Sequence, residues 1–341
     1  MIVGAIQTVV EGRSLARDTA REVMEAILTG GVTPAQFGAL VTALRLKGES
    51  ADEIAGFLES MRAHATRVDL GDLPAVDACG TGGRGVSWFN VTTTAALVAA
   101  GAGAKVAKHG NRSFTRKSGS ADAFEALGVR LAVTPAVVAQ SVREAGIGFM
   151  FAQAFHPSMK FAAPLRREIG IRTMFNVLGP LTNPAGVRRQ LLGVATPALA
   201  ATMAAALQKM GAVRVLVVAG HGGMDEVTLD GPTQVTELRD GSIASYTVSA
   251  EDLGLAASEP GSVAGGTPDE NAVTIRGILD GADRGPRRDL AIANAAGVLL
   301  AAGVADSWRD GVERAAAAID DGAAAASLER MVAITNSTSG S

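Results

Sequence analysis

The stretch AVDACGTGGRGVSWFNVTTTAALVAAG, residues 75–101, joins an apolar segment to a helical one through a glycine-rich turn. AVDAC has the pattern of a short buried strand, and VTTTAALVAAG has that of a helix. The glycines at 80, 82 and 83 indicate a backbone that takes positive φ or approaches another group closely. Such a turn points several N–H groups at one place, where the following helix N-terminus adds partial positive charge. The stretch therefore predicts an anion-binding turn.

The same alternation of strand and helix continues along the chain. AKVAKHG (104–110) and VRVLVVAG (213–220) predict further strands, and the second is a β-branched run typical of a strand covered on both faces. Helical patterns cover residues 120–129, 134–146, 270–282, 289–303 and 308–335. Strands that alternate with helices predict an α/β domain with a central, mostly parallel sheet flanked by helices. Residues 255–268 have the composition of a linker.

The N-terminal part of the chain predicts a small all-helical domain without strands. Helices are expected to begin at Thr19, at the Thr33-Pro34 pair and at Ser50, and the last two positions have the capping-box pattern. Three short amphipathic helices bury little surface alone, so this unit is expected to pack on the rest of the chain or on a second subunit. The expected domains are residues 1–70, joined by part of 160–190, and residues 71–341.

Composition excludes several classes of protein. The 341 residues are 48% hydrophobic, enough for a full core, and the formal net charge is -3, so no overall basic field favours nucleic acid or a membrane surface. Cys79 is the single cysteine, which excludes an internal disulfide and a cysteine metal cluster; it is expected to be a buried small side chain. The first residues lack the pattern of a secretion signal, and no apolar run is long enough to span a membrane. We expect a cytoplasmic protein.

Two further stretches carry groups that suit a phosphorylated ligand. KHGNRSFTRKSGSAD (108–122) places basic residues before Ser118-Gly119-Ser120, which open a helix in an anion-binding arrangement. GHGGMDEV (220–227) places Asp225 and Glu226 directly after a buried strand. Adjacent carboxylates at a strand end suit Mg²⁺, which takes one or two carboxylates together with substrate phosphate oxygens.

With FHPSMKFAAPLRREIGIRTMFNVLGPLTNPAG (155–186), these motifs give the chain a nearly end-to-end resemblance to the anthranilate phosphoribosyltransferase family. Members of that family join anthranilate to phosphoribosyl pyrophosphate in tryptophan biosynthesis. The resemblance implies a helical domain used for homodimerisation and an α/β domain of the nucleoside-phosphorylase type, with the active site between them. It also implies Mg²⁺ as the metal.

Site residues carried over from the resemblance fall into three groups. Those implied to hold the phosphoribosyl donor are Gly80, Gly83, Asn90, Thr92, Thr93, Lys108, Asn111, Arg112 and Ser120. Those implied to hold anthranilate are Gly80, His109, Asn111 and Arg166, with Arg166 on its carboxylate. Those implied to hold Mg²⁺ are Thr92, Asp225 and Glu226. Three departures from the family are assigned to the donor site as well, namely Arg84, where an acidic residue is usual, Trp88 and Arg116.

The reaction places modest demands on the residues. An aromatic amine is neutral at pH 7 and magnesium pyrophosphate is a good leaving group, so the protein mainly positions two substrates and neutralises charge. No catalytic nucleophile is expected. Two alternatives stay open: a related transferase or phosphorylase acting on another aromatic or heterocyclic acceptor, and a non-catalytic binder of phosphorylated ligands or nucleic acid. Net acidity and the presence of Arg166 argue against the last.

Overall fold

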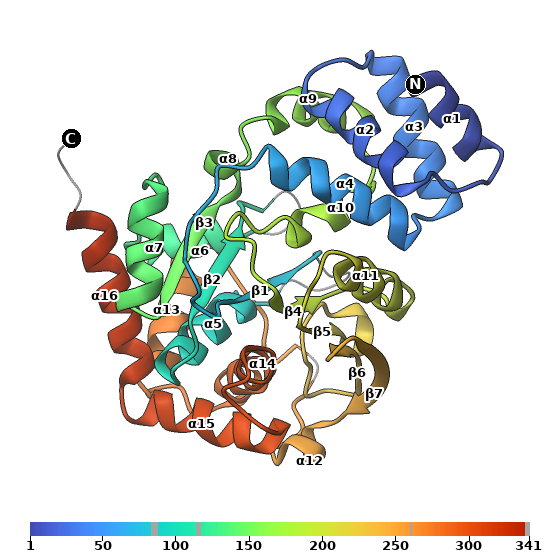
Figure 1. Cartoon of the computed structure of the whole chain (residues 1–341). Coiled ribbons are helices and arrows are strands. Elements are labelled where there is room, and N and C mark those ends of the chain that lie inside the picture. The colour runs from blue at the N-terminus through green and yellow to red at the C-terminus, as the bar shows by residue number, and fades with distance from the viewer. Residues whose placement is uncertain (83–87, 114–116, 260, 338–341) are drawn as a thin grey trace.

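The computed structural model describes residues 1–82, 88–113, 117–259 and 261–337. Figure 1 shows a cluster of helices at the N-terminal end, beside a larger part built around one sheet. The predicted fold class, a small helical domain with a larger α/β domain, is confirmed. Within the described residues, no helix combines the length and apolarity needed to cross a bilayer.

The described strands form one seven-stranded sheet in the order β3-β2-β1-β4-β5-β6-β7. Pairing is parallel from β3 to β5 and antiparallel for β5–β6 and β6–β7, so the predicted mostly parallel sheet is confirmed. The strands are β1 (Val76–Gly80), β2 (Val106–Gly110), β3 (Ile147–Phe151), β4 (Arg189–Gly193), β5 (Arg214–Ala219), β6 (Thr233–Arg239) and β7 (Ser242–Val248).

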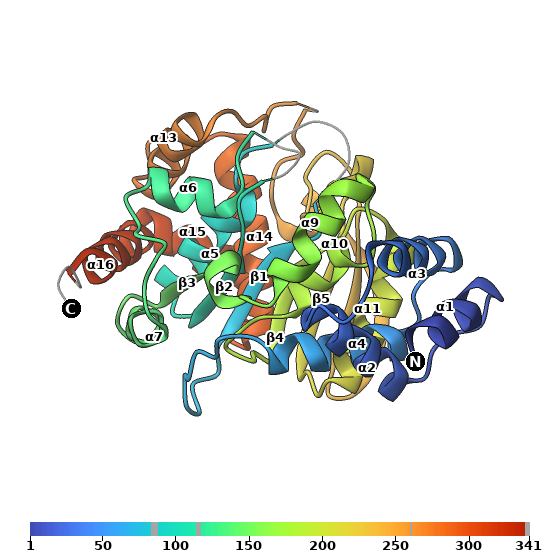
Figure 2. The same cartoon turned by 90° about the horizontal axis from the view of Figure 1, so that it is seen from above.

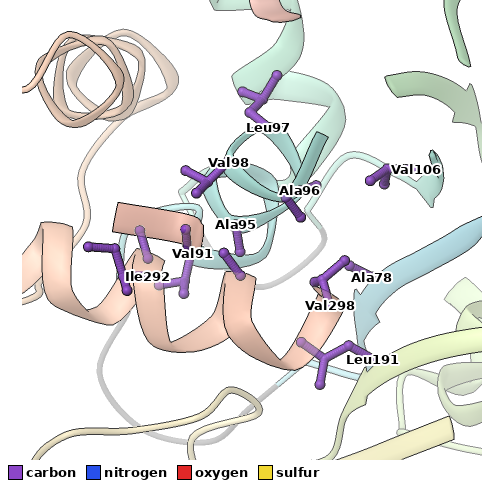
Figure 3. Packing of buried hydrophobic residues seen from close by; sticks show 14 of the residues in the cluster. Ala78, Val91, Ala95, Ala96, Leu97, Val98, Val106, Leu191, Ile292 and Val298 are labelled. Carbon is purple, nitrogen blue, oxygen red and sulfur yellow. The ribbon is translucent and has the colours of Figure 1, made fainter. Parts of the chain in front are cut away.

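Successive residues of the central strands enter two different hydrophobic cores, because side chains alternate between the faces of a sheet. In β4, Leu191 belongs to one core and Leu192 to the other. The first core is covered by helices α5 (Val91–Gly101) and α14 (Pro286–Ala302). Figure 3 shows their alanines and valines against Ala78 and Leu191. The small side chains let these helices approach the sheet closely.

The second core joins the sheet to the N-terminal helices and to α11 (Pro197–Lys209). Val23 and Phe57 of the helical part share this core with Leu192 of β4. The expectation that the helical unit packs on the rest of the chain is therefore confirmed. The N-terminal helices are α1 (Ile2–Val10), α2 (Arg17–Leu28), α3 (Pro34–Lys47) and α4 (Ala51–Ala63).

Two expectations for the helical part were wrong. Four helices precede β1 in the described chain; the sequence analysis found three, because α1 has no side-chain cap and no acidic residue in its first turn to mark its start. Helix α2 begins at Arg17 after Ala16, which makes no side-chain cap, so Thr19 does not start it. The capping boxes predicted at Thr33 and Ser50 are both present.

The remaining helices cover the sheet or cross its carboxyl edge (Figures 1 and 2). Residues 308–335, read as one helical stretch, form two helices that separate at Asp321-Gly322. These elements are α6 (Ser120–Ala126), α7 (Pro135–Glu144), α8 (Ala152–Phe155), α9 (Met159–Ile169), α10 (Phe175–Leu178), η1 (Gly179–Leu181), η2 (His221–Gly223), α12 (Ala250–Leu253), α13 (Pro268–Leu279), α15 (Trp308–Asp320) and α16 (Ala323–Ser337).

The packing of α5 predicts a strong dependence of stability on Leu97, which is fully buried in the first core. We expect Leu97→Ala to lower the free energy of unfolding by about 2–5 kcal/mol, because a cavity replaces the lost side chain. Val273→Ala is the control, since Val273 is 72% exposed on α13 and its truncation creates no cavity. Urea unfolding followed by circular dichroism measures both; equal midpoints would contradict the assigned core.

Candidate functional site

A cavity of about 290 Å³ opens at the carboxyl edge of the sheet, where β1, β2 and β5 end. In open parallel sheets this edge is where connecting loops converge and ligands bind. The structure brings most of the predicted site residues together around it. The predicted residues that line the cavity are Gly80, Trp88, Asn90, Thr92, Thr93, Lys108, His109, Asn111, Arg112, Ser120, Asp225 and Glu226.

Two buried carboxylates form one wall of this cavity. Asp225 accepts a hydrogen bond from the Gly82 N–H at 2.9 Å, and Glu226 accepts one from the Thr92 hydroxyl. The segment that carries them approaches the strands so closely that side chains are excluded there. A Cβ on Gly80 would lie 2.2 Å from an Asp225 carboxylate oxygen, and one on Gly193 would lie 1.8 Å from the Asp225 carbonyl oxygen. Both strands must therefore end in glycine.

These oxygens fit a magnesium ion. Asp225 and Glu226 are 3% and 5% exposed, and carboxylates buried to this degree require compensating partners. Among the described residues, no cluster of three or more His, Cys, Asp or Glu could enclose a metal. The protein therefore offers a partial set of hard oxygen ligands, which suits an ion that keeps water and phosphate oxygens in its shell.

Two buried polar side chains, Lys108 and Asp77, lie at the floor of the cavity and bond the backbone of β1 and β2. Lys108 donates to the Ala78 carbonyl at 2.5 Å, and Asp77 accepts from the backbone N–H groups of Ala78 and His109 at 2.7 and 3.1 Å. Burial raises the pKa of Asp77, and the Lys108 ammonium opposes that shift. Burial also raises the pKa of Cys79 well above its usual value, which keeps it a thiol. Cys79 is buried, as predicted.

Two buried imidazoles lie side by side at the cavity. The rings of His109 and His156 are 5.0 Å apart between centroids, and His109 lines the cavity. Burial lowers the pKa of His109 well below its usual value and that of His156 to about 4, so both rings are neutral at pH 7. Within the ranges described, neither Nε2 atom has a hydrogen-bonding partner. His109 therefore presents a neutral imidazole ring at the cavity.

In the second predicted anion-binding loop, residues 108–122, carboxylates of the protein already pair with some of the N–H and cationic groups. Asp122 accepts from the Gly119 N–H at 2.8 Å, so the N-terminus of α6 is capped by a carboxylate. Arg112 forms ion pairs of 2.8 Å with Asp122 and with Glu125. The loop that was predicted to bind an anion therefore holds a cation already engaged by two carboxylates, while Ser120 and Asn111 still face the cavity.

Arg166 lies outside the lining of the cavity. Its guanidinium stacks 5.3 Å from the ring centroid of Phe175, which is next to the cavity-lining Asn176. In the part of the chain that the structure describes, no carboxylate lies within 4 Å of this group. Burial lowers the pKa of Arg166. A half-buried cation in such surroundings suits an anionic ligand, so its assignment to anthranilate stays a prediction.

Arg172 and Asn176 line the cavity and were missed by the sequence analysis. Arg172 donates to the carbonyl oxygens of Thr81 and Gly82 at 2.8 and 3.3 Å, which ties the segment after α9 to the glycine turn. No periodicity marks either residue, because Arg172 lies in irregular backbone and Asn176 in the four-residue helix α10. Asp77 did carry a signal, since a carboxylate inside an apolar strand is uncommon. Gly83, Arg84 and Arg116, assigned to the donor from the sequence, lie outside the described residues.

Comparison with known proteins shows the family to which the chain belongs. Residues 72–325 match the glycosyl transferase family, a/b domain, and residues 3–65 match the helical bundle domain of the same family. The anthranilate phosphoribosyltransferase of Roseiflexus sp. (strain RS-1) is 52% identical over 97% of each chain. That of Moorella thermoacetica is 51% identical over 98% of each chain.

Solved structures agree with these relatives. Anthranilate phosphoribosyltransferase from Thermus thermophilus superposes with a TM-score of 0.92 at 42% identity, over 97% of this chain and 99% of the other. The Saccharomyces cerevisiae enzyme in complex with PRPP and Mg has a TM-score of 0.89 at 28% identity, over 98% of each chain. The chain therefore belongs to the anthranilate phosphoribosyltransferases, within the glycosyl transferase family that combines a helical bundle with an a/b domain.

Proposed function

We propose that the protein transfers the phosphoribosyl group of phosphoribosyl pyrophosphate to anthranilate, with release of pyrophosphate, as a step of tryptophan biosynthesis. The observation that carries the proposal is the pair of buried carboxylates, Asp225 and Glu226, which face a cavity with the glycine turn and Lys108. Mg²⁺ takes one or two protein carboxylates together with substrate phosphate oxygens, so such a pair suits a magnesium pyrophosphate group.

The donor site is assigned to the carboxyl ends of β1 and β2 and to the start of α5. Gly80 is the last residue of β1 and Lys108 lies within β2. Asn90, Thr92 and Thr93 lie at the N-terminus of α5, where partial positive charge favours phosphate. Mg²⁺ when bound would neutralise the departing pyrophosphate. Asp225, Glu226 and the Thr92 hydroxyl are the groups of this chain that would hold it.

The acceptor is assigned to the side of the cavity that faces α9 and α10. Arg166 would pair with the anthranilate carboxylate, and His109 with Asn111 would contact the ring and the amine. In the reaction, the amine nitrogen forms a bond to the anomeric carbon while the bond from that carbon to pyrophosphate breaks. The product nitrogen then loses its proton. The neutral His109 ring does not add positive charge beside the cationic transition state.

The helical part also carries the proposed dimer contact. Its domain is taken as residues 1–70 with part of 160–190, against 71–341 for the α/β domain. Val3 and Val10 on α1 and Leu46 on α3 are 66, 68 and 83% exposed in the single chain, and their apolar surface suits burial against a second copy. We place the homodimer in the cytoplasm, since a chain with one cysteine has no internal disulfide that needs an oxidising compartment.

The activity is tested by the loss of anthranilate fluorescence in the presence of phosphoribosyl pyrophosphate and Mg²⁺. Asp225→Asn with Glu226→Gln keeps the shape of the metal site and removes both charges, so we expect most of this activity to disappear and excess Mg²⁺ to restore little. Glu251→Gln with Asp252→Asn is the matched control, an adjacent exposed pair on α12. Donor turnover without anthranilate loss would favour another acceptor, and full activity of the double variant would make the pair structural.

A second prediction concerns the acceptor. Arg166→Ala should raise the KM for anthranilate about 10- to 100-fold, the worth of a lost charge-assisted hydrogen bond, with little change in the KM for the donor. Arg167→Ala is the control, because Arg167 is the exposed neighbour on the same helix. Steady-state kinetics with each substrate varied in turn measures both constants. Unchanged anthranilate kinetics in Arg166→Ala would remove this residue from the site.

A further inference from the structure

Asn271 on α13 lies outside the lining of the cavity, yet its side chain reaches a residue that lines it. It is 2% exposed. Its Oδ1 accepts from the Gly266 N–H at 2.9 Å, and its Nδ2 donates to Asn90 Oδ1 at 2.8 Å and to the Gly266 carbonyl at 3.4 Å. One buried amide thus joins the loop before α13 to the N-terminus of α5. Figure 2 shows α13 next to α6, at the same end of the molecule as that loop.

These bonds determine which way each amide faces. A backbone N–H can only donate, so Gly266 requires the oxygen of Asn271 on its side. The Nδ2 of Asn271 is therefore directed at Asn90, whose side chain must accept this hydrogen bond through its Oδ1. The orientation of Asn90 follows from a backbone group on another segment, through Asn271.

The consequence for the cavity concerns what Asn90 offers to a ligand. Its Oδ1 also accepts from the Ser118 hydroxyl at 3.0 Å, so the oxygen is committed to two protein donors. Its NH2 group makes a long contact of 3.5 Å with the Ser118 carbonyl. Phosphate and ribose oxygens accept hydrogen bonds readily, so an NH2 group is the end of the amide that suits the donor.

The loop that carries Gly266 is itself held against the glycine turn. Trp88 and Ala264 form an isolated antiparallel bridge, and the Phe89 N–H donates to the Val263 carbonyl at 3.3 Å. A Cβ on Gly265 would lie 2.4 Å from the Trp88 carbonyl oxygen. Residues 263–265, within the stretch that has the composition of a linker, therefore support the backbone at Trp88 and Phe89.

We propose that Asn271 is a positioning residue for the phosphoribosyl donor, acting by holding the Asn90 amide with its NH2 group toward the ligand. This inference rests on the proposed function, because it takes Asn90 as a donor contact. Asn271 touches no substrate in this account. Its role is the choice between two orientations of Asn90 that have nearly the same shape.

The test compares two substitutions by calorimetry with phosphoribosyl pyrophosphate and Mg²⁺. Asn271→Ala releases Asn90 and should weaken donor affinity about three- to tenfold, the worth of a neutral hydrogen bond. Asn271→Asp keeps the volume and the bond to Gly266 but presents a second acceptor to Asn90, whose amide must turn over. Its oxygen then faces the donor, and affinity should fall about 10- to 100-fold. A purely structural role predicts the opposite order, with Asp the milder change.

A double-mutant cycle separates the turned amide from the added charge. In an Asn90→Ala background, Asn271→Asp should change donor affinity by less than about twofold, because no amide is left to turn. Ile278→Val on the same helix is the stability control and should bind like the parent. If the Asp variant binds as well as the Ala variant, or if its effect persists without Asn90, the inference is overturned. A parent protein that binds no donor would instead refute the proposed function on which it rests.

Discussion

The site depends on one close contact, between the segment that carries Asp225 and the carboxyl ends of β1 and β4. Gly80 and Gly193 end those strands without side chains, and the aspartate backbone and carboxylate occupy the space that a Cβ would fill. The Gly82 N–H then bonds the carboxylate, and Asn294 of α14 holds both backbone groups of Val227 at 2.9 Å. A buried charge needs such partners. This contact places two carboxylates opposite the helix N-terminus that is assigned to phosphate.

The two-sided sheet makes the contact possible. Alternate residues of β1, β4 and β5 enter two cores, one shared with α5 and α14 and the other with the N-terminal helices. Parallel strands that are covered on both faces leave their ends as the accessible edge, and loops from distant parts of the chain meet there. The segment after α9 reaches the same edge through Arg172, which bonds the glycine turn. The regions assigned to the donor and to the acceptor are thus joined by the hydrogen bond from Arg172 to the glycine turn.

Sequence reasoning succeeded where one residue type has one physical use. Glycines before α5, the capping residues Thr33 and Ser50, and the carboxylates after β5 could all be placed in advance. It failed where packing against distant parts of the chain determines the local structure. Strand β3 is a five-residue apolar run that periodicity cannot distinguish from a buried helix, and β7 is mostly exposed, with Val248 its one buried residue. Arg172 bonds the carbonyl oxygens of Thr81 and Gly82, and Asn271 bonds the side chain of Asn90, so nothing local in the sequence marks either role. For Arg166 the sequence supplied a role, and the structure adds its stacking on the ring of Phe175.

The most direct test of this account is the effect of Gly193→Ala on Mg²⁺-dependent affinity for phosphoribosyl pyrophosphate. Residue 193 is not proposed to touch the donor, but its new methyl group would meet the Asp225 carbonyl and displace both carboxylates. Misplacement by about 1 Å can cost about 100-fold, so affinity should fall at least about tenfold in a variant with the circular dichroism of the parent. Gly38→Ala, where α3 leaves open space, should bind normally. Parent-like affinity in a folded Gly193→Ala variant would contradict the claim that this contact builds the site.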